Sequence, residues 1–182
     1  GTLIWCNSYL TNITGIPAAT NNGTIFFDFD LNPATDSIYV CGTTDFLPGD
    51  ARSYVTCLNA ASGAMNWQTD VNTLVGANGS DNFMSIVYQN GLLYTTGFAN
   101  VGVTFDDATL YCLNASNGTI QWGRNISFLS VHNANASLVG DNVPLQIYVN
   151  GNTFLLAGVT QNNFGASQSQ TSFALRGQFT TT

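Results

Sequence analysis

Lysine and glutamate are both absent from this 182-residue chain. All ten acidic residues are aspartates and all three basic residues are arginines, so only 7% of the sequence is charged, against roughly 25% in a typical soluble domain. Lysine and glutamate favour helices, whereas the abundant Asn, Thr, Gly, Val, Tyr and Phe favour strands and turns. We therefore expect an all-β protein.

Positive charge is scarce, which excludes several classes of partner. The net charge is −7, and Arg52, Arg124 and Arg176 are scattered. They form no basic stripe that could follow a phosphate backbone or an anionic membrane surface, and no apolar run approaches the roughly 20 residues of a spanning helix. We expect neither nucleic-acid binding nor membrane insertion. Because Gly1 replaces an initiator methionine and no signal-peptide pattern follows, we expect a processed or excised segment.

Residues suited to catalysis or metal binding are few. The four cysteines show no CxxC spacing, and the single histidine, His132, lies in an Asn-rich connection without a recognisable triad. Asp28 and Asp30 would share one face of a strand, where they could hold a divalent ion. A solvated strand face is the simpler interpretation, and we adopt it. We expect no enzymatic activity, no cofactor and no metal site.

The sequence does contain a repeat marked by tryptophan. Trp5, Trp67 and Trp122 are separated by 62 and 55 residues, and the segments YVTCLNAASGAMNW and LYCLNASNGTIQW align before the last two. A third relative, SFALRGQ, ends the chain without its tryptophan strand. Hairpin signals lie upstream of the three copies, including Asn90-Gly91 and Asn150-Gly151, which suit two-residue turns. The pattern predicts units of four antiparallel strands.

The repeat divides a single all-β domain, residues 1–182, into four parts. Residues 24–69 form a first unit, with strands near 24–31, 36–43, 52–59 and 63–69. Residues 83–124 form a second, with strands near 83–89, 92–98, 108–114 and 118–124. Residues 144–177 form an incomplete third unit, with strands near 144–149, 153–160 and 171–177. Residues 1–8, with a strand near 2–7, would supply the fourth strand that this unit lacks.

At YVCGTT, CLNAASGAMNW and CLNASNGTIQW the chain resembles β-propeller blade repeats, both the quinoprotein-like repeat and the repeat of secreted seven-bladed propellers. The resemblance covers most of the chain and implies three four-stranded, propeller-like blades. It implies a scaffold only, because the chain lacks the adjacent cysteines and the glutamate of quinone-dependent enzymes. A β-sandwich with accidental internal similarity is the alternative.

The opening copy of the tryptophan strand differs from the internal copies. Leu3 and Trp5 match their apolar positions, but Ile4 and Cys6 stand where those copies have polar residues or glycine: Asn66, Gln68, Gln121 and Gly123. Burying Ile4 alone would contribute about 1.5–3 kcal/mol. We therefore expect Leu3, Ile4, Trp5 and Cys6 to form an assembly strand that completes a third unit, which could belong to a neighbouring molecule.

A donated strand is a head-to-tail contact that either closes a ring or propagates a filament. The sequence thus predicts a secreted, glycosylated structural protein whose partner is another copy of itself, in an extracellular filament or other assembly. The alternative is a carbohydrate-binding or adhesin propeller fragment of a larger extracellular protein.

Seven Asn-x-Ser/Thr sites lie on or beside expected loops: Asn12, Asn22, Asn78, Asn114, Asn117, Asn125 and Asn135. Such sites accept N-linked glycans in secreted proteins, where cysteines often form disulfides. Cys41 and Cys57 would face each other on neighbouring strands if the intervening loop has the right length. Cys112 stays unassigned, and Cys6 could lock a donated strand covalently.

The glycosylation prediction concerns the mass of the protein. Because the seven sites fall on or beside loops, protein from its native source should exceed the 19.4 kDa of the polypeptide and return to that mass after enzymatic removal of N-linked glycans. Intact mass spectrometry checks this. A native mass equal to that of the bare chain would refute the prediction.

Overall fold

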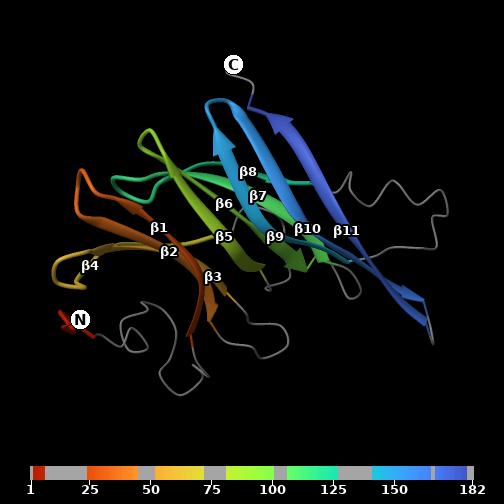
Figure 1. The fold of residues 1–182 in the computed structure, drawn as a ribbon, viewed down its shortest axis with the longest axis horizontal. Helices are drawn as coiled ribbons and strands as arrows, with labels where there is room; N and C mark the ends of the chain where they lie inside the picture. The colour runs from red at the N-terminus through yellow and green to blue at the C-terminus, as the bar shows by residue number, and fades with distance from the viewer. Residues whose placement is uncertain are drawn as a thin grey trace.

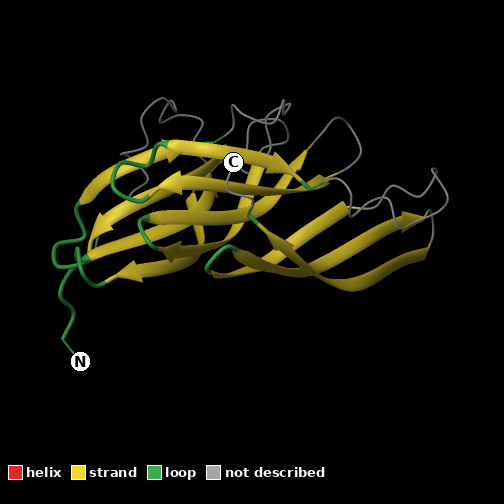
Figure 2. Ribbon diagram, turned by 90° about the horizontal axis from the view of Figure 1, so that it is seen from above, coloured by secondary structure: helices red, strands yellow, loops and turns green. Residues whose placement is uncertain are grey.

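The computed structural model describes residues 2–6, 24–44, 52–71, 81–100, 106–126, 141–164 and 167–179. Within these residues the protein is all-β, as predicted, and contains no helix (Figure 2). Eleven strands form three separate antiparallel sheets, not the two sheets of a simple sandwich. A search of the described residues for an apolar helix of membrane-spanning length finds none.

Each sheet is a meander in which strands pair in chain order. The first contains β1 (Thr24–Asn32), β2 (Ser37–Thr44), β3 (Arg52–Asn59) and β4 (Met65–Asp70). The second contains β5 (Asp81–Gln89), β6 (Leu92–Asn100), β7 (Asp106–Asn114) and β8 (Ile120–Asn125). The third contains β9 (Asp141–Asn150), β10 (Thr153–Phe164) and β11 (Ser167–Gln178). These strands confirm the eleven internal strands predicted from the repeat, to within a few residues at each end.

The hairpin turns differ in one detail from the prediction. Asn90 and Gly91 form a two-residue turn with φ of 51° and 81°, as expected. In the third sheet Asn150 pairs with Thr153, so the turn residues are Gly151 and Asn152, one position later than predicted. There only the first turn residue, Gly151, has a positive φ, of 60°. A glycine at that position is typical of a type II′ turn.

A one-residue bulge marks the same position in every sheet. In each sheet, the pairing skips one residue of the first strand: Phe27, Met84 or Leu145. Beside the skipped residue, the second strand has a glycine: Gly42, Gly97 or Gly158. A bulge inserts one unpaired residue and bends the strand. Its recurrence allows the three sheets to be aligned residue by residue.

Consecutive sheets pack face to face in chain order (Figure 1). One apolar core lies between the first and second sheets and contains Tyr39, Cys41, Val55, Cys57, Val71, Phe83, Ile86, Leu93, Tyr111, Leu113 and Ala115. A second core lies between the second and third sheets and contains Tyr94, Ala108, Leu110, Cys112, Ile126, Ile147, Val149 and Leu156. The middle sheet is therefore covered on both faces, whereas each outer sheet has one face that packs on no other sheet of the described residues.

Two carboxylates of β1 join the first sheet to the second. Oδ2 of Asp28 accepts hydrogen bonds from Ser85 Oγ at 2.8 Å and from Ile86 N at 3.1 Å. Oδ2 of Asp30 accepts one from Tyr88 N at 2.7 Å. These bonds satisfy backbone N–H groups on the free edge of β5, which would otherwise lack partners. The prediction of a solvated aspartate face is therefore wrong, because this face of β1 adjoins another sheet.

The predicted disulfide is also wrong. All four cysteines are free thiols in the structure. Cys41 pairs with Val55 and Cys57 pairs with Tyr39, so the two cysteines are offset by two residues along their strands. Burial and the nearby Asp28 carboxylate raise the pKa of Cys41 to about 12, and burial raises the pKa of Cys112 to about 11. Cys57 is buried, and only Cys6 is exposed.

Thiol labelling should therefore distinguish Cys6 from the other three cysteines. In dilute protein, where single molecules prevail, a thiolate-selective reagent at mildly alkaline pH should react with one thiol per folded chain, because the buried thiols are shielded and two of them are difficult to ionise. After unfolding, all four should react. Labelling followed by peptide mass spectrometry checks both numbers. Rapid native labelling of Cys41, or fewer than four thiols after unfolding, would contradict the structure.

Candidate functional site

The opening segment lies beside the first sheet, not the third. Residues 2–6 form no strand within the chain, so the predicted twelfth strand is not formed in a single molecule. The indole nitrogen Nε1 of Trp5 donates a hydrogen bond to the carbonyl oxygen of Ala60 at 2.8 Å. Leu3 and Ile4 are largely exposed. The views in Figures 1 and 2 agree that this end of the chain is far from β11.

Ala60 lies directly after the third strand of its sheet, at a position that recurs in all three sheets. Its N–H donates to Asp36 O at 2.7 Å, just as Ala115 N donates to Gly91 O at 2.9 Å and Phe179 N donates to Asn152 O at 2.7 Å. The same hydrogen bond thus identifies three equivalent positions directly after β3, β7 and β11. We call the described residues that follow the third strand of each sheet, up to the start of the fourth strand where there is one, the third-strand turn.

Each internal tryptophan contacts the third-strand turn of the next sheet. Trp67 of β4 packs closely on Gly118 of the second sheet, whose carbonyl accepts a hydrogen bond from Thr69 Oγ1 at 2.8 Å. Trp122 of β8 packs on Phe179 of the third sheet, with 5.6 Å between ring centroids. Both tryptophans belong to the fourth strand of a sheet.

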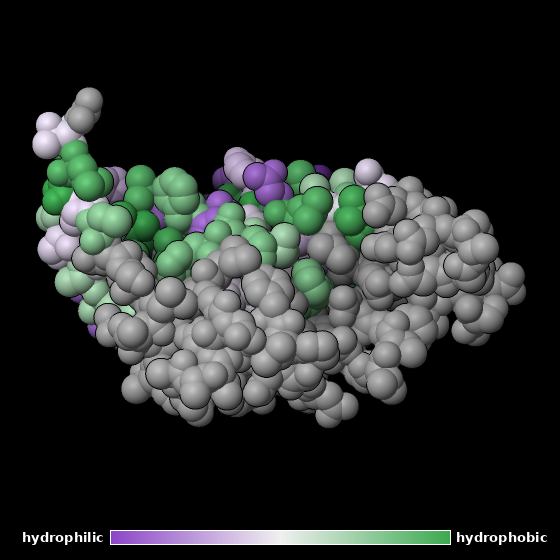
Figure 3. All heavy atoms as spheres, turned by 90° about the horizontal axis from the view of Figure 1, so that it is seen from below, coloured by the Kyte–Doolittle hydropathy of each residue, from purple (hydrophilic) through white to green (hydrophobic). Residues whose placement is uncertain are grey.

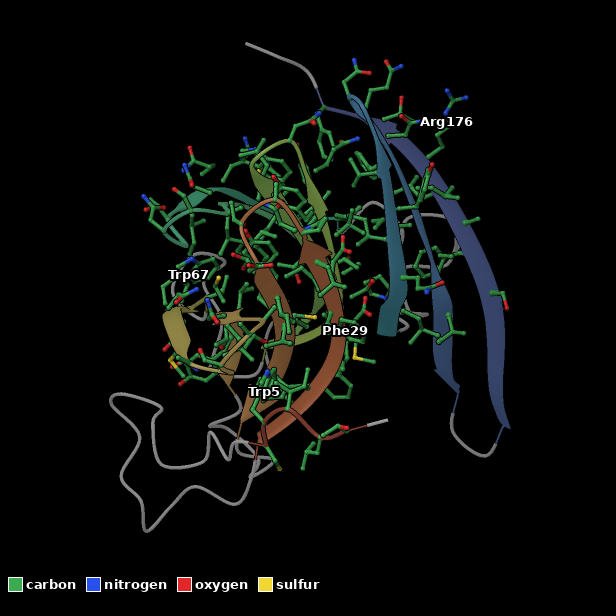
Figure 4. The ribbon with its side chains drawn as sticks, turned by 60° about the vertical axis from the view of Figure 1, so that its left-hand side comes forward. Trp5, Phe29, Trp67 and Arg176 are labelled. Atoms are coloured by element: carbon green, nitrogen blue, oxygen red, sulfur yellow. The ribbon has the colours of Figure 1, made fainter. Side chains whose placement is uncertain are left out.

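Unlike Trp67, whose buried Nε1 has no hydrogen-bond partner among the described residues, Trp5 contacts this region of the first sheet through a hydrogen bond. Its partner Ala60 lies in that sheet's third-strand turn, although the described residues contain no sheet that precedes it. Residues 2–6 therefore lie beside the third-strand turn of the first sheet. Figure 4 shows Trp5 beside the first sheet, with Arg176 on β11 at the far side of the molecule.

Within the described residues, the third sheet has no fourth strand. β3 pairs with β4 and β7 pairs with β8, but no described segment pairs with the outer edge of β11. Unpaired N–H and C=O groups on such an edge are a template for another strand. The predicted assembly strand and the edge that it would complete are thus both present but not joined.

The outer faces of the first and third sheets are a feature that the sequence reasoning missed. Phe29 and Leu31 of β1 are exposed, as are Tyr148 and Leu155 of the third sheet. Figure 3 shows hydrophobic side chains gathered on the described part of the lower side of the molecule. The alternation of aromatic and acidic residues in TIFFDFDL could have revealed this face.

A cavity of about 560 Å³ lies between the turns of the first and second sheets. The amide side chains of Asn32, Asn66 and Asn114 line it together with three aromatic rings. The ring of Tyr39 packs on Trp67 and on Tyr88, at centroid distances of 6.1 and 5.6 Å. These contacts occupy ring surface that a sugar would need for stacking.

The predicted glycosylation sites differ in accessibility. Asn117 is exposed in the turn between β7 and β8. Asn114 is half-buried, and its Oδ1 accepts hydrogen bonds from N and Oγ of Ser116 at 2.8 and 2.7 Å, as Asn59 does from Ser62 in the first sheet. Asn125 is the last residue of β8. The remaining sites, Asn12, Asn22, Asn78 and Asn135, lie outside the described residues, as does His132.

Nothing in the described residues resembles a metal centre, since no three or more His, Cys, Asp or Glu side chains gather there. The sequence matches no protein-family model, and a search of curated proteins finds no similar protein. The candidate site therefore consists of the opening segment, the free edge of β11 and the two outer sheet faces.

Gly118 and Gly91 test the packing of tryptophan on the third-strand turn as a matched pair. Both have a positive φ, of 72° and 81°, so alanine at either position incurs a cost of about 1–2 kcal/mol. A Cβ at Gly118 would also lie 2.5 Å from the Trp67 ring, whereas nothing lies within 4 Å of one at Gly91. Gly118→Ala should therefore lower the free energy of unfolding by about 1–3 kcal/mol more than Gly91→Ala does. Urea denaturation measures both values, and equal losses would show that this contact is not tight.

Proposed function

We propose that the protein is a secreted, glycosylated structural subunit that assembles head to tail, each molecule donating residues 2–6 to the third sheet of its neighbour. The observation that carries this proposal is the position of Trp5. It contacts the third-strand turn of the first sheet, as the fourth-strand tryptophans of the first two sheets contact the sheets that follow them.

The proposal treats the three sheets as propeller-like blades. Closed propellers have about four to eight blades, so three blades leave one sheet face and one strand edge to be completed from elsewhere. Two molecules with three sheets each would provide six blades in a closed ring. The same head-to-tail contact repeated without closure gives a filament.

Three features of the sequence and the turns support a place outside the cell. Seven acceptor sites for N-linked glycans occur in the chain, and one of them, Asn117, lies exposed in a turn. The chain also lacks lysine, the residue at which many intracellular modifications occur. A heavily glycosylated surface with few charges suits a structural protein exposed to the exterior.

The carbohydrate-binding alternative rests on the cavity between the first two sheets. Its amide groups could bind hydroxyl groups, but Tyr39 is buried and packs against both other rings. The assembly strand has no comparable obstacle, because the apolar side chains of Leu3 and Ile4 are already exposed. Assembly is therefore the better-supported function.

Removal of residues 1–8 should abolish assembly. The truncated protein loses the donated strand but keeps the three sheets, so it should run as a monomer where the full chain forms larger species. Size-exclusion chromatography with light scattering and negative-stain electron microscopy measure this. Assemblies that persist after truncation would contradict the proposal.

A synthetic peptide supplies the control for the folded state of the truncated protein. A labelled peptide of residues 1–8 should bind the truncated protein, because the edge of β11 then has no competing donor. A scrambled peptide of the same composition should not bind. Fluorescence anisotropy distinguishes the two, and equal binding would show that the interaction is non-specific.

A further inference from the structure

We infer that the neighbouring molecules meet through a third copy of the internal sheet-to-sheet interface, in which Arg176 of one molecule lies against Trp5 of the next. This inference rests on the proposed assembly and identifies the surfaces and the register that it uses. The recurring bulge makes equivalent positions in the three sheets directly comparable.

The exposed face of the first sheet matches faces that are buried in the other two. Phe29, Ile86 and Ile147 each lie two residues after the bulge of their sheet. Ile86 is 1% exposed and Ile147 is 5% exposed, because each packs on the preceding sheet. Phe29 is 62% exposed. It therefore occupies a position that packs on a preceding sheet in both internal interfaces.

The exposed face of the third sheet matches the other half of the same interface. In each sheet a glycine of the second strand lies opposite the bulge. Three residues before that glycine the second strand has Tyr39, Tyr94 and Leu155, in the first, second and third sheets respectively. Tyr39 is 2% exposed and Tyr94 is 7% exposed, because the following sheet covers each of them. Leu155 is 42% exposed. The third sheet thus presents the surface that a first sheet would cover.

The register of the donated strand follows from the two complete sheets. Cys57 pairs with Trp67, and Cys112 pairs with Trp122. The equivalent residue of β11 is Arg176, because it pairs with Leu155 as Cys57 pairs with Tyr39 and Cys112 with Tyr94. Arg176 therefore pairs with Trp5 of the neighbour. By the same register, Leu175 pairs with Cys6, as Thr56 pairs with Gln68.

A hollow on the third sheet lies where this register places the indole of Trp5. Its volume is about 290 Å³, and its lining includes Tyr148, Leu155 and Arg176. Trp67 and Trp122 pack beside the equivalents of Leu155, with ring centroids 6.1 Å from Tyr39 and 6.3 Å from Tyr94. An arginine over an indole gives a favourable cation–π contact, and Arg176 is exposed in the single chain.

A second copy is the occupant that the observations favour, because the two exposed faces are the two halves of one repeating interface. They continue the series of contacts already made between the first and second and between the second and third sheets. A partner of unrelated sequence would have no reason to match both faces and the strand register. Further blades of a longer polypeptide are the competing occupant, and the experiment below separates the two.

The variant Leu175→Cys tests the register with a native thiol as its partner. Residues directly opposite each other in antiparallel strands have the separation that a disulfide requires. The introduced thiol should therefore form a disulfide with Cys6 of the neighbouring molecule under mild oxidation, giving a ladder of multiples of the chain mass on non-reducing gels. Ala174→Cys is the matched control, because it lies one residue out of register and on the opposite face. Neither it nor the unmodified protein should cross-link.

A measurement on the unmodified protein guards against a folding defect, since Leu175 packs on the second core. Hydrogen exchange of the β11 backbone amides should be slower in assemblies of the full chain than in the protein that lacks residues 1–8, because the donated strand pairs with that edge. If light scattering shows assemblies but Leu175→Cys does not cross-link and the β11 amides exchange at equal rates, the inferred interface is wrong and the proposed assembly stands. If all proteins are monomeric, as a fragment awaiting further blades of its own chain would be, the proposed assembly itself fails.

The contribution of Arg176 is measured by its effect on self-association. Arg176→Ala should weaken the association by about 2- to 30-fold, the range expected for loss of one cation–π contact. Arg124→Ala is the control of equal charge change, because Arg124 is exposed on β8 and its guanidinium donates to the adjacent carbonyl of Gly123. Sedimentation velocity over a range of concentrations gives both values. Equal effects of the two substitutions would overturn the assignment of Arg176.

Discussion

A sheet with two apolar faces must be covered on both, and this constraint governs the whole molecule. The middle sheet meets it because the first and third sheets lie on its two faces. The outer sheets meet it on one side only, which leaves Phe29 on one end of the stack and Leu155 on the other. Uncovered apolar surface of this kind on a folded domain marks an interaction site.

The contact between sheets has three parts that act together. Apolar side chains fill the space between the faces, the carboxylates of Asp28 and Asp30 satisfy the free edge of β5, and a tryptophan of the fourth strand packs on the next third-strand turn. The edge of an inner strand is thereby protected from unwanted pairing. Of these three parts, the opening segment provides only the tryptophan. Trp5 contacts the third-strand turn of the first sheet, although residues 2–6 belong to no sheet in the single chain.

The sequence predicted the strands well because the repeat and its turn residues are local signals. Asn90-Gly91 and the two internal tryptophan segments, each with a glycine in its turn, predict hairpins without tertiary information. The environment of Asp28 and Asp30 could not be predicted, because it depends on which sheet lies beside β1. The pairing of Cys41 with Cys57 failed for a similar reason, since a shift of two residues in register separates two thiols that spacing alone places together. The position of Trp5 required the fold, although its kinship with Trp67 and Trp122 was evident from the repeat.

The central claim is that residues 2–6 of one molecule form the fourth strand of another molecule's third sheet. Cryo-electron microscopy of native material tests it most directly, because it shows both the assembly and the path of the chain. The account predicts rings or filaments in which density for Trp5 lies beside Arg176 of a different molecule. Isolated particles, or density that connects residues 2–6 to β11 of the same molecule, would contradict it.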